Sequence, residues 1–218
     1  MNEHTRKLHD LGQRLWLDNI SRSLLRSGSL QRYINEFSIT GLTSNPAIFE
    51  QAFGGDAYDD SISVPDAAGL ASDELFFELA MEDLTQAADL FRPIFDASGG
   101  ADGRVSLEVS PLLADNTAHT IQTASRLFER AARATLFIKI PDTPEGVRAV
   151  EEVSFDDVAI NVTLLFSREH YLAAAEAYMR GIERLLEAGL DPRVASVASL
   201  FVSRWDAEVK EEISIAGR

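Results

Sequence analysis

Short apolar segments alternate along this chain with longer segments in which apolar residues recur every three or four positions. The longer segments are typical of amphipathic helices, and the short ones are typical of buried strands. The short segments predict strands over residues 14–19, 39–44, 105–110, 136–140, 159–165 and 195–202. Because strands and helices alternate, we expect an α/β fold with a parallel sheet.

Three of the predicted helices have recognisable boundary residues. Ser72 is suited to cap a helix that Pro93 should end or kink, because proline lacks the backbone N–H that an α-helix requires. Thr143 and Ser167 are suited to cap the starts of two further helices. Residues 50–103 combine a polar loop rich in Gly, Ser and Asp with the helix after Ser72, and we interpret them as an insertion.

Two architectures fit such a sheet, an open doubly wound sheet and a closed (β/α)8 barrel. No glycine-rich nucleotide-binding motif follows a predicted strand, and polar residues gather instead near the C-terminal ends of the strands. Barrel enzymes place their chemistry at that end, so the polar residues favour a barrel.

The polar residues share one face of each predicted strand. Successive strand residues point to opposite faces, so parity separates an aliphatic face from a second face. The second faces hold Asp18, Thr43, Asn45, Glu108, Lys139, Asn161, Thr163, Ser199 and Phe201. If these faces converge, they form a polar site at the mouth of the barrel.

Lys139 is the most informative single residue, because it lies inside an apolar strand while Lys7 and Lys210 lie in charged terminal segments. Desolvating an ammonium group is costly, so a lysine in this setting is rarely structural. Removal from water favours the neutral amine, which can attack a carbonyl. A structural ion pair with Glu108 or Asp18 is the alternative.

Glu108 and Asp18 are the carboxylates that Schiff-base chemistry would need for proton transfer. Either could equally be a strand-end residue in a hydrogen-bond network, and their joint presence with Lys139 favours catalysis. Asn45 precedes a proline and could simply form a turn. Arg204 follows the last strand and could bind phosphate through its planar donors, or could be a solvated surface residue.

Composition narrows the classes of partner and cofactor. The net charge of −15 argues against general binding to nucleic acid or an anionic membrane. There is no cysteine, and the four histidines have no metal-ligand spacing, so we predict no metal site. No apolar run reaches the length of a membrane span, and no signal-peptide core opens the chain, so we expect a cytoplasmic protein.

Several motifs occur in the same order as in the transaldolase family, which the chain resembles over almost its whole length. They are residues 43–49 (TSNPAIF), 107–111 (LEVSP), 138–141 (IKIP), 161–167 (NVTLLFS) and 196–204 (SVASLFVSR). The opening RLWLD at 14–18 and the insertion after Phe49 are most similar to the longer bacterial subfamily, which includes fusions to phosphoglucose isomerase.

The resemblance implies a (β/α)8 barrel of the class I aldolase type, with no cofactor and no metal. It implies transfer of a dihydroxyacetone unit from sedoheptulose 7-phosphate to glyceraldehyde 3-phosphate in the pentose phosphate pathway. Lys139 would form the Schiff base, and Asp18 would act as acid and base at the C4 hydroxyl. Glu108 would move protons through a water that Thr163 helps to hold.

The resemblance also implies the residues that contact substrate. Asn45 and Asn161 would bind the dihydroxyacetone hydroxyls with Ser199 beside them, and Arg204 would bind phosphate. Thr43 and Phe201, on the same strand faces, complete the expected substrate-binding set.

About six of the eight βα units of such a barrel are predicted in this chain. We therefore expect a single barrel domain over residues 1–218, truncated at its C-terminus, with residues 50–103 inserted in it. The expected partners are sugar phosphate substrates. The chain could also form a homodimer or associate through the incomplete barrel. A fructose 6-phosphate aldolase and a truncated, non-catalytic chain are the alternative functions.

Overall fold

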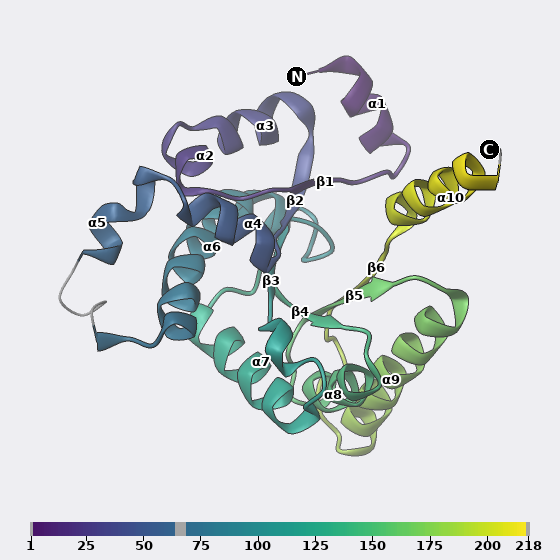
Figure 1. Cartoon of the computed structure of the whole chain (residues 1–218). Coiled ribbons are helices and arrows are strands. Elements are labelled where there is room, and N and C mark those ends of the chain that lie inside the picture. The colour runs from purple at the N-terminus through teal and green to yellow at the C-terminus, as the bar shows by residue number, and fades with distance from the viewer. Residues whose placement is uncertain (1, 64–68, 217–218) are drawn as a thin grey trace. The chain divides into compact units, whose positions relative to one another are not determined.

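A computed structural model describes residues 2–63 and 69–216 of the chain (Figure 1). The chain divides into two compact units. The first comprises Met1–Glu108 with Phe128–Phe137, and the second comprises Val109–Leu127 with Ile138–Arg218.

The six predicted strands are confirmed, with ends that lie within two residues of the predicted ones. They are β1 (Leu15–Asp18), β2 (Ile39–Thr43), β3 (Arg104–Glu108), β4 (Leu136–Pro141), β5 (Ile160–Leu165) and β6 (Ser196–Leu200). In the first unit β1 pairs with β2 and β2 with β3, and in the second β4 pairs with β5 and β5 with β6; all four pairings are parallel. Within each unit the strand order follows the order in the chain, as successive βα units require.

Helices separate the strands along the sequence. The first group is α1 (Glu3–Asp10), α2 (Arg22–Arg26), α3 (Ser29–Phe37), α4 (Pro46–Phe53), the 3₁₀ helix η1 (Asp56–Tyr58), α5 (Asp59–Ile62) and α6 (Ser72–Ala97). The second group is the 3₁₀ helix η3 (Pro111–Leu113), α7 (Thr117–Ala131), α8 (Pro144–Phe155), α9 (Arg168–Glu187) and α10 (Val202–Ala216). Across residues 2–63 and 69–216, no helix combines the length and the apolar character needed to cross a membrane.

In the first unit, α6 packs on β2 and β3 and buries Leu84 and Phe91 against the aliphatic side of the sheet. Pro93 lies inside this helix, which continues to Ala97, so of the two predicted outcomes, an end or a kink at Pro93, the end is wrong. The missing N–H costs one backbone hydrogen bond, and burial of Phe91 with half-burial of Ile94 and Phe95 offsets that loss.

The polar loop predicted within residues 50–103 contains the short helices η1 and α5. Tyr58, at the end of η1, is buried, and its hydroxyl donates to Asp83 of α6 (2.6 Å) and accepts from the backbone of Arg22 (2.8 Å). Arg22 also donates to Asp83 (2.9 Å). This buried network fastens the loop to α6 and to α2, the helix that follows β1.

In the second unit, α8 and α9 lie side by side and cover β5 (Figure 1). Two of the three predicted caps are confirmed, since Thr143 Oγ1 accepts from Gly146 and Ser167 Oγ accepts from His170. The cap predicted at Ser72 is wrong, because Ser72 is the first residue of α6 and Ala71 occupies the N-cap position. The helices approach closely at Gly181, where an added Cβ would lie 2.6 Å from the Cβ of Ser154. Only glycine permits this distance, which brings the two strand–helix units together.

Candidate active site

Lys139 lies in the middle of β4 and is 5% exposed. In the parallel pairing of β4 with β5, Lys139 is opposite Asn161, and Pro141 is opposite Thr163. Opposed residues of neighbouring strands project from the same face of a sheet. Lys139, Asn161 and Thr163 therefore share one face, as the parity of the sequence predicted.

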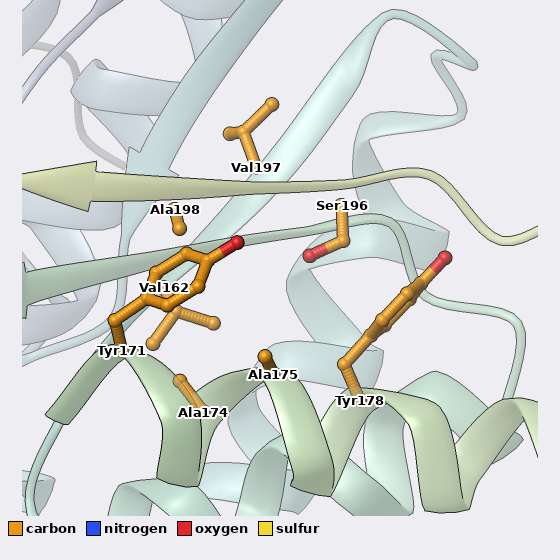
Figure 2. Close-up of a pocket in the computed structure, with 8 residues that line it drawn as sticks. All are labelled: Val162, Tyr171, Ala174, Ala175, Tyr178, Ser196, Val197 and Ala198. Carbon is orange, nitrogen blue, oxygen red and sulfur yellow. The ribbon is translucent and has the colours of Figure 1, made fainter. Parts of the chain in front are cut away.

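Figure 2 shows the two faces of β6, the strand that pairs with β5. Ser196 and Ala198 of β6 point toward α9, whereas Val197 between them points to the opposite side. Val197 is opposite Asn161 in the strand pairing, so the side away from α9 is the lysine-bearing face. The helix-facing side encloses a hollow of about 200 Å³ between α9 and the two strands, lined by Val162, Tyr171, Ala174, Ala175, Tyr178 and the three β6 residues. This hollow is separate from the lysine-bearing face.

The side chain of Asn161 is held in place by a neighbour. Asn161 is 1% exposed, and its Oδ1 accepts a hydrogen bond from Ser199 Oγ at 2.8 Å. This hydrogen bond fixes the orientation of the carboxamide on the lysine-bearing face.

Thr163 is fully buried, and its hydroxyl makes no hydrogen bond with the described part of the chain. The next residue, Leu164, has a φ of 63°, in the left-handed region that is costly for residues other than glycine. The register of β5 against β6 shifts between Val162 and Leu165. The strand therefore bulges directly after Thr163, a kind of local strain that is common near functional sites.

An aromatic group lies where β6 passes into α10. The Phe201 ring packs against Phe166 with their centroids 5.7 Å apart, and Trp205 Nε1 donates to the Phe166 carbonyl at 2.8 Å. The guanidinium of Arg204, an exposed residue, lies 5.1 Å from the Phe201 ring centroid. A shallow hollow of about 200 Å³ is lined by Phe166, Arg204, Trp205 and Glu208. Arg204 is thus presented to solvent over an aromatic surface, beside an acidic neighbour.

The first unit carries the remaining predicted residues. Asp18 at the end of β1 is opposite Thr43 of β2, and Thr43 is opposite Ser106 of β3, so the three share a face. Asp18 is exposed, whereas Glu108, the last residue of β3, is half-buried. Both carboxylates stand at the C-terminal ends of their strands, where a barrel enzyme carries its chemistry.

Asn45 has a structural role that the sequence also allowed. Its Oδ1 accepts from Ile48 at 3.0 Å and caps α4, which begins with Pro46. A capping carboxamide still has an NH₂ group that can donate, so capping and substrate binding are compatible. The first unit thus brings together Asp18 and Thr43, with Asn45 just beyond β2.

The described residues contain no group of three or more His, Asp or Glu side chains that could hold a metal ion.

A family model described as "Transaldolase/Fructose-6-phosphate aldolase" matches residues 15–216, which is nearly the whole chain. The chain belongs to this family. The fold of the transaldolase/aldolase family is a (β/α)8 barrel, and the six βα units described here agree with that fold class.

Individual transaldolases match the chain at moderate identity. Transaldolase 2 of Nostoc punctiforme is 44% identical over an alignment covering 94% of this chain and 54% of that protein. The transaldolase of Trichodesmium erythraeum is 42% identical, with coverages of 96% and 56%. For the transaldolase of an Arthrobacter species the identity is 41%, with coverages of 100% and 59%. The chain therefore spans only 54 to 59% of the length of these relatives.

Two residues near Lys139 in this transaldolase/aldolase-family chain were not predicted from the sequence. Asp142 follows β4 directly, and its Oδ2 lies 3.0 Å from Nδ1 of His170 in the first turn of α9. Burial raises the pKa of the Asp142 carboxyl to about 6, although the charge of His170 acts in the opposite direction. A polar residue directly after a strand end was a signal for Asp142, but nothing in the sequence linked it to His170.

Proposed function

We propose that this chain carries a transaldolase site that moves a dihydroxyacetone unit from sedoheptulose 7-phosphate to glyceraldehyde 3-phosphate. The observation that supports this most strongly is the environment of Lys139. It is a buried lysine in an apolar strand, and it lies opposite an asparagine whose carboxamide is oriented by Ser199. These contacts support Lys139 as the nucleophile and Asn161 as a binding group for the donor ketose.

The proposed reaction begins when Nζ of Lys139 adds to the C2 carbonyl of the ketose phosphate. Loss of water then gives a Schiff base. Asp18 takes the proton from the C4 hydroxyl, the C3–C4 bond breaks, and erythrose 4-phosphate leaves. The bound three-carbon enamine next adds to the aldehyde carbon of glyceraldehyde 3-phosphate, and Asp18 returns the proton to the new hydroxyl. Hydrolysis releases fructose 6-phosphate and free Lys139.

Proton transfer during carbinolamine formation and dehydration is assigned to Glu108, through a water held partly by Thr163. The buried Thr163 hydroxyl, which bonds to no other group in the described chain, is compatible with that role. The proposed steps use no metal ion or organic cofactor.

Asn45 and Asn161 are proposed to bind the dihydroxyacetone hydroxyls, with Ser199, Thr43 and Phe201 completing the substrate contacts. Arg204 is proposed to bind a substrate phosphate. Because the chain has a net charge of −15, attraction of a sugar phosphate must come from local groups of this kind. An exposed guanidinium above an aromatic ring keeps its planar donors accessible to phosphate oxygens.

The six βα units are proposed to be six of the eight in one barrel domain, with residues 50–103 inserted after the second strand. A cytoplasmic location is proposed for this enzyme, which acts on phosphorylated metabolites. Association with a second chain is the further arrangement that six units would allow.

The test of transfer is turnover with sedoheptulose 7-phosphate and glyceraldehyde 3-phosphate, measured as fructose 6-phosphate formed. Lys139→Arg should abolish turnover, because a guanidinium does not form a Schiff base. Lys210→Arg on α10 is the matched control and should leave the rate unchanged. Turnover that survives in Lys139→Arg would contradict the proposal.

A fructose 6-phosphate aldolase is the second candidate, and the description of the matching family names both activities. The two activities differ in the fate of the three-carbon unit. An aldolase releases free dihydroxyacetone from fructose 6-phosphate without an acceptor, whereas a transaldolase requires the acceptor aldehyde. Dihydroxyacetone released at the same rate with and without erythrose 4-phosphate would favour the aldolase.

A further inference from the structure

Asp142 links the ends of two strands that carry site residues. It directly follows β4, and its backbone N–H donates to the carbonyl of Thr163 in β5 at 2.9 Å. Its carboxylate Oδ2 lies 3.0 Å from Nδ1 of His170, in the first turn of the helix that follows β5. One residue therefore connects the end of β4 both to β5 and to the start of α9.

The connection is made at a buried position. The side chain of Asp142 is 3% exposed, while that of His170 is 46% exposed. Asp142 Oδ1 is buried and makes no hydrogen bond within the described part of the chain, so His170 is the main support of this carboxylate. Without the imidazole, a buried carboxylate would remain with neither of its oxygens bonded, a costly arrangement.

The residues on either side of Asp142 and His170 connect this pair to Lys139 and to two helix starts. Lys139 lies three residues before Asp142, with Pro141 restricting the backbone between them. On the far side, Thr143 caps α8 and its hydroxyl also bonds to the carbonyl of Ala114. His170 is itself held by Ser167, which accepts from its backbone N–H at 3.1 Å. Each side of the pair is thus attached to a helix start.

We propose that Asp142 and His170 form a positioning pair that holds the lysine-bearing end of β4 against the first turn of α9. The proposal deepens the Schiff-base function, because a lysine nucleophile works only when its strand is fixed relative to Asn161 and Thr163. The pair acts through Lys139 and contacts no reacting atom.

The electrostatics of Asp142 give the pair a recognisable pH signature. Burial raises the pKa of Asp142 to about 6, and the field of His170 lowers it from what burial alone would give. β5 carries no charged residue between Ile160 and Leu165. The charged residues on the other neighbouring segments are Asp115 before α7, Lys139 on β4, Glu145 and Arg148 at the start of α8, and Arg168, Glu169 and His170 at the start of α9. Of these, Glu145 pairs with Arg148.

The first test measures amide hydrogen exchange in the full chain at pH 7.5. His170→Ala and Asp142→Ala should speed exchange in peptides covering residues 139–146 and 163–171 by about tenfold or more, as expected for loss of a charged hydrogen bond. Asp142→Asn, which can still bond to an uncharged imidazole, should speed it less. His119→Ala, which removes an exposed histidine of α7, is the control and should have no effect on these peptides. Unchanged exchange in His170→Ala would overturn the proposal.

The second test measures the rate at which fructose 6-phosphate and cyanoborohydride label Lys139 between pH 5 and 8. The wild-type rate should fall on the acid side with an inflection near pH 6. The inflection should disappear in Asp142→Asn and move to higher pH in His170→Ala, while His119→Ala should keep the wild-type profile. An identical pH profile of Lys139 labelling in all variants would overturn the proposal that the pair positions Lys139. Absence of any adduct on wild-type Lys139 would refute the proposed function instead, and the exchange experiment would still decide whether the pair holds β4.

Discussion

Removal of the Asp83 carboxylate should destabilise the first unit more than any change at an exposed charge. Asp83 is fully buried and accepts from Arg22 Nε (2.9 Å) and from the Tyr58 hydroxyl (2.6 Å). In Asp83→Ala the Arg22 side chain, 4% exposed, loses its buried counter-charge, and Tyr58 loses its acceptor. Such a change typically costs about 3–5 kcal/mol.

The same arginine supplies an internal control. Arg22 also pairs with Glu82 at 2.6 Å, but the Glu82 side chain is 54% exposed. Glu82→Ala should therefore cost at most about 1 kcal/mol, the range of surface ion pairs. The contrast compares a buried with an exposed carboxylate on the same helix and the same guanidinium, and the Tyr58 hydroxyl, which binds only Asp83, is separated by the Tyr58→Phe variant.

Thermal unfolding followed by circular dichroism measures both variants. For a chain of this size about 1 kcal/mol shifts Tm by about 2–4 °C, so Asp83→Ala should lower Tm by about 6–20 °C. Tyr58→Phe should cost about 1–3 kcal/mol, and its effect should be strongly reduced in the Asp83→Ala background. Equal losses in Asp83→Ala and Glu82→Ala would refute the reasoning from burial.

Three further predictions concern the second unit. Gly181→Val should destabilise the protein by about 1–3 kcal/mol in urea unfolding, because a Cβ there would lie 2.6 Å from Ser154 Cβ. The control Gly69→Ala should be neutral, because a Cβ added at Gly69 would have no neighbouring atom within 4 Å. Arg204→Ala should raise KM for phosphorylated sugars and leave KM for unphosphorylated analogues unchanged; equal changes would exclude phosphate recognition. Because the folded pKa of Asp142 is about 6 and its ordinary value is 3.8, the folded state binds this proton more tightly. The resulting stabilisation is complete below about pH 4 and is lost as the pH rises through 6. From pH 4.5 to 7.5 the free energy of unfolding of the wild type should therefore fall by about 1–3 kcal/mol relative to that of Asp142→Asn. A rise relative to Asp142→Asn would contradict this sign.

The strands and several helix starts could be predicted because their signals are local. An apolar run with a polar alternate face marks β4 and β5, and the caps at Thr143 and Ser167 need only residues three positions away. The shared face of Lys139 and Asn161 followed from parity, which the strand register bears out.

The features that sequence reasoning missed depend on contacts between distant segments. Asp142 meets His170 across 28 positions, and Tyr58 meets Asp83 across 25, so neither pair has a local signature. Whether α6 would end or kink at Pro93 was left open for a related reason. Propensity opposes a proline inside a helix, and the tertiary burial of the surrounding helix outweighs that preference.

The most direct test of the account is to trap the intermediate on the lysine. The protein is treated with fructose 6-phosphate and borohydride, digested, and mapped by mass spectrometry. The account predicts one reduced three-carbon adduct, on the peptide that contains Lys139, and none when borohydride or sugar is omitted. An adduct confined to Lys7 or Lys210, or no adduct in a sample that turns over substrate, would contradict the central claim.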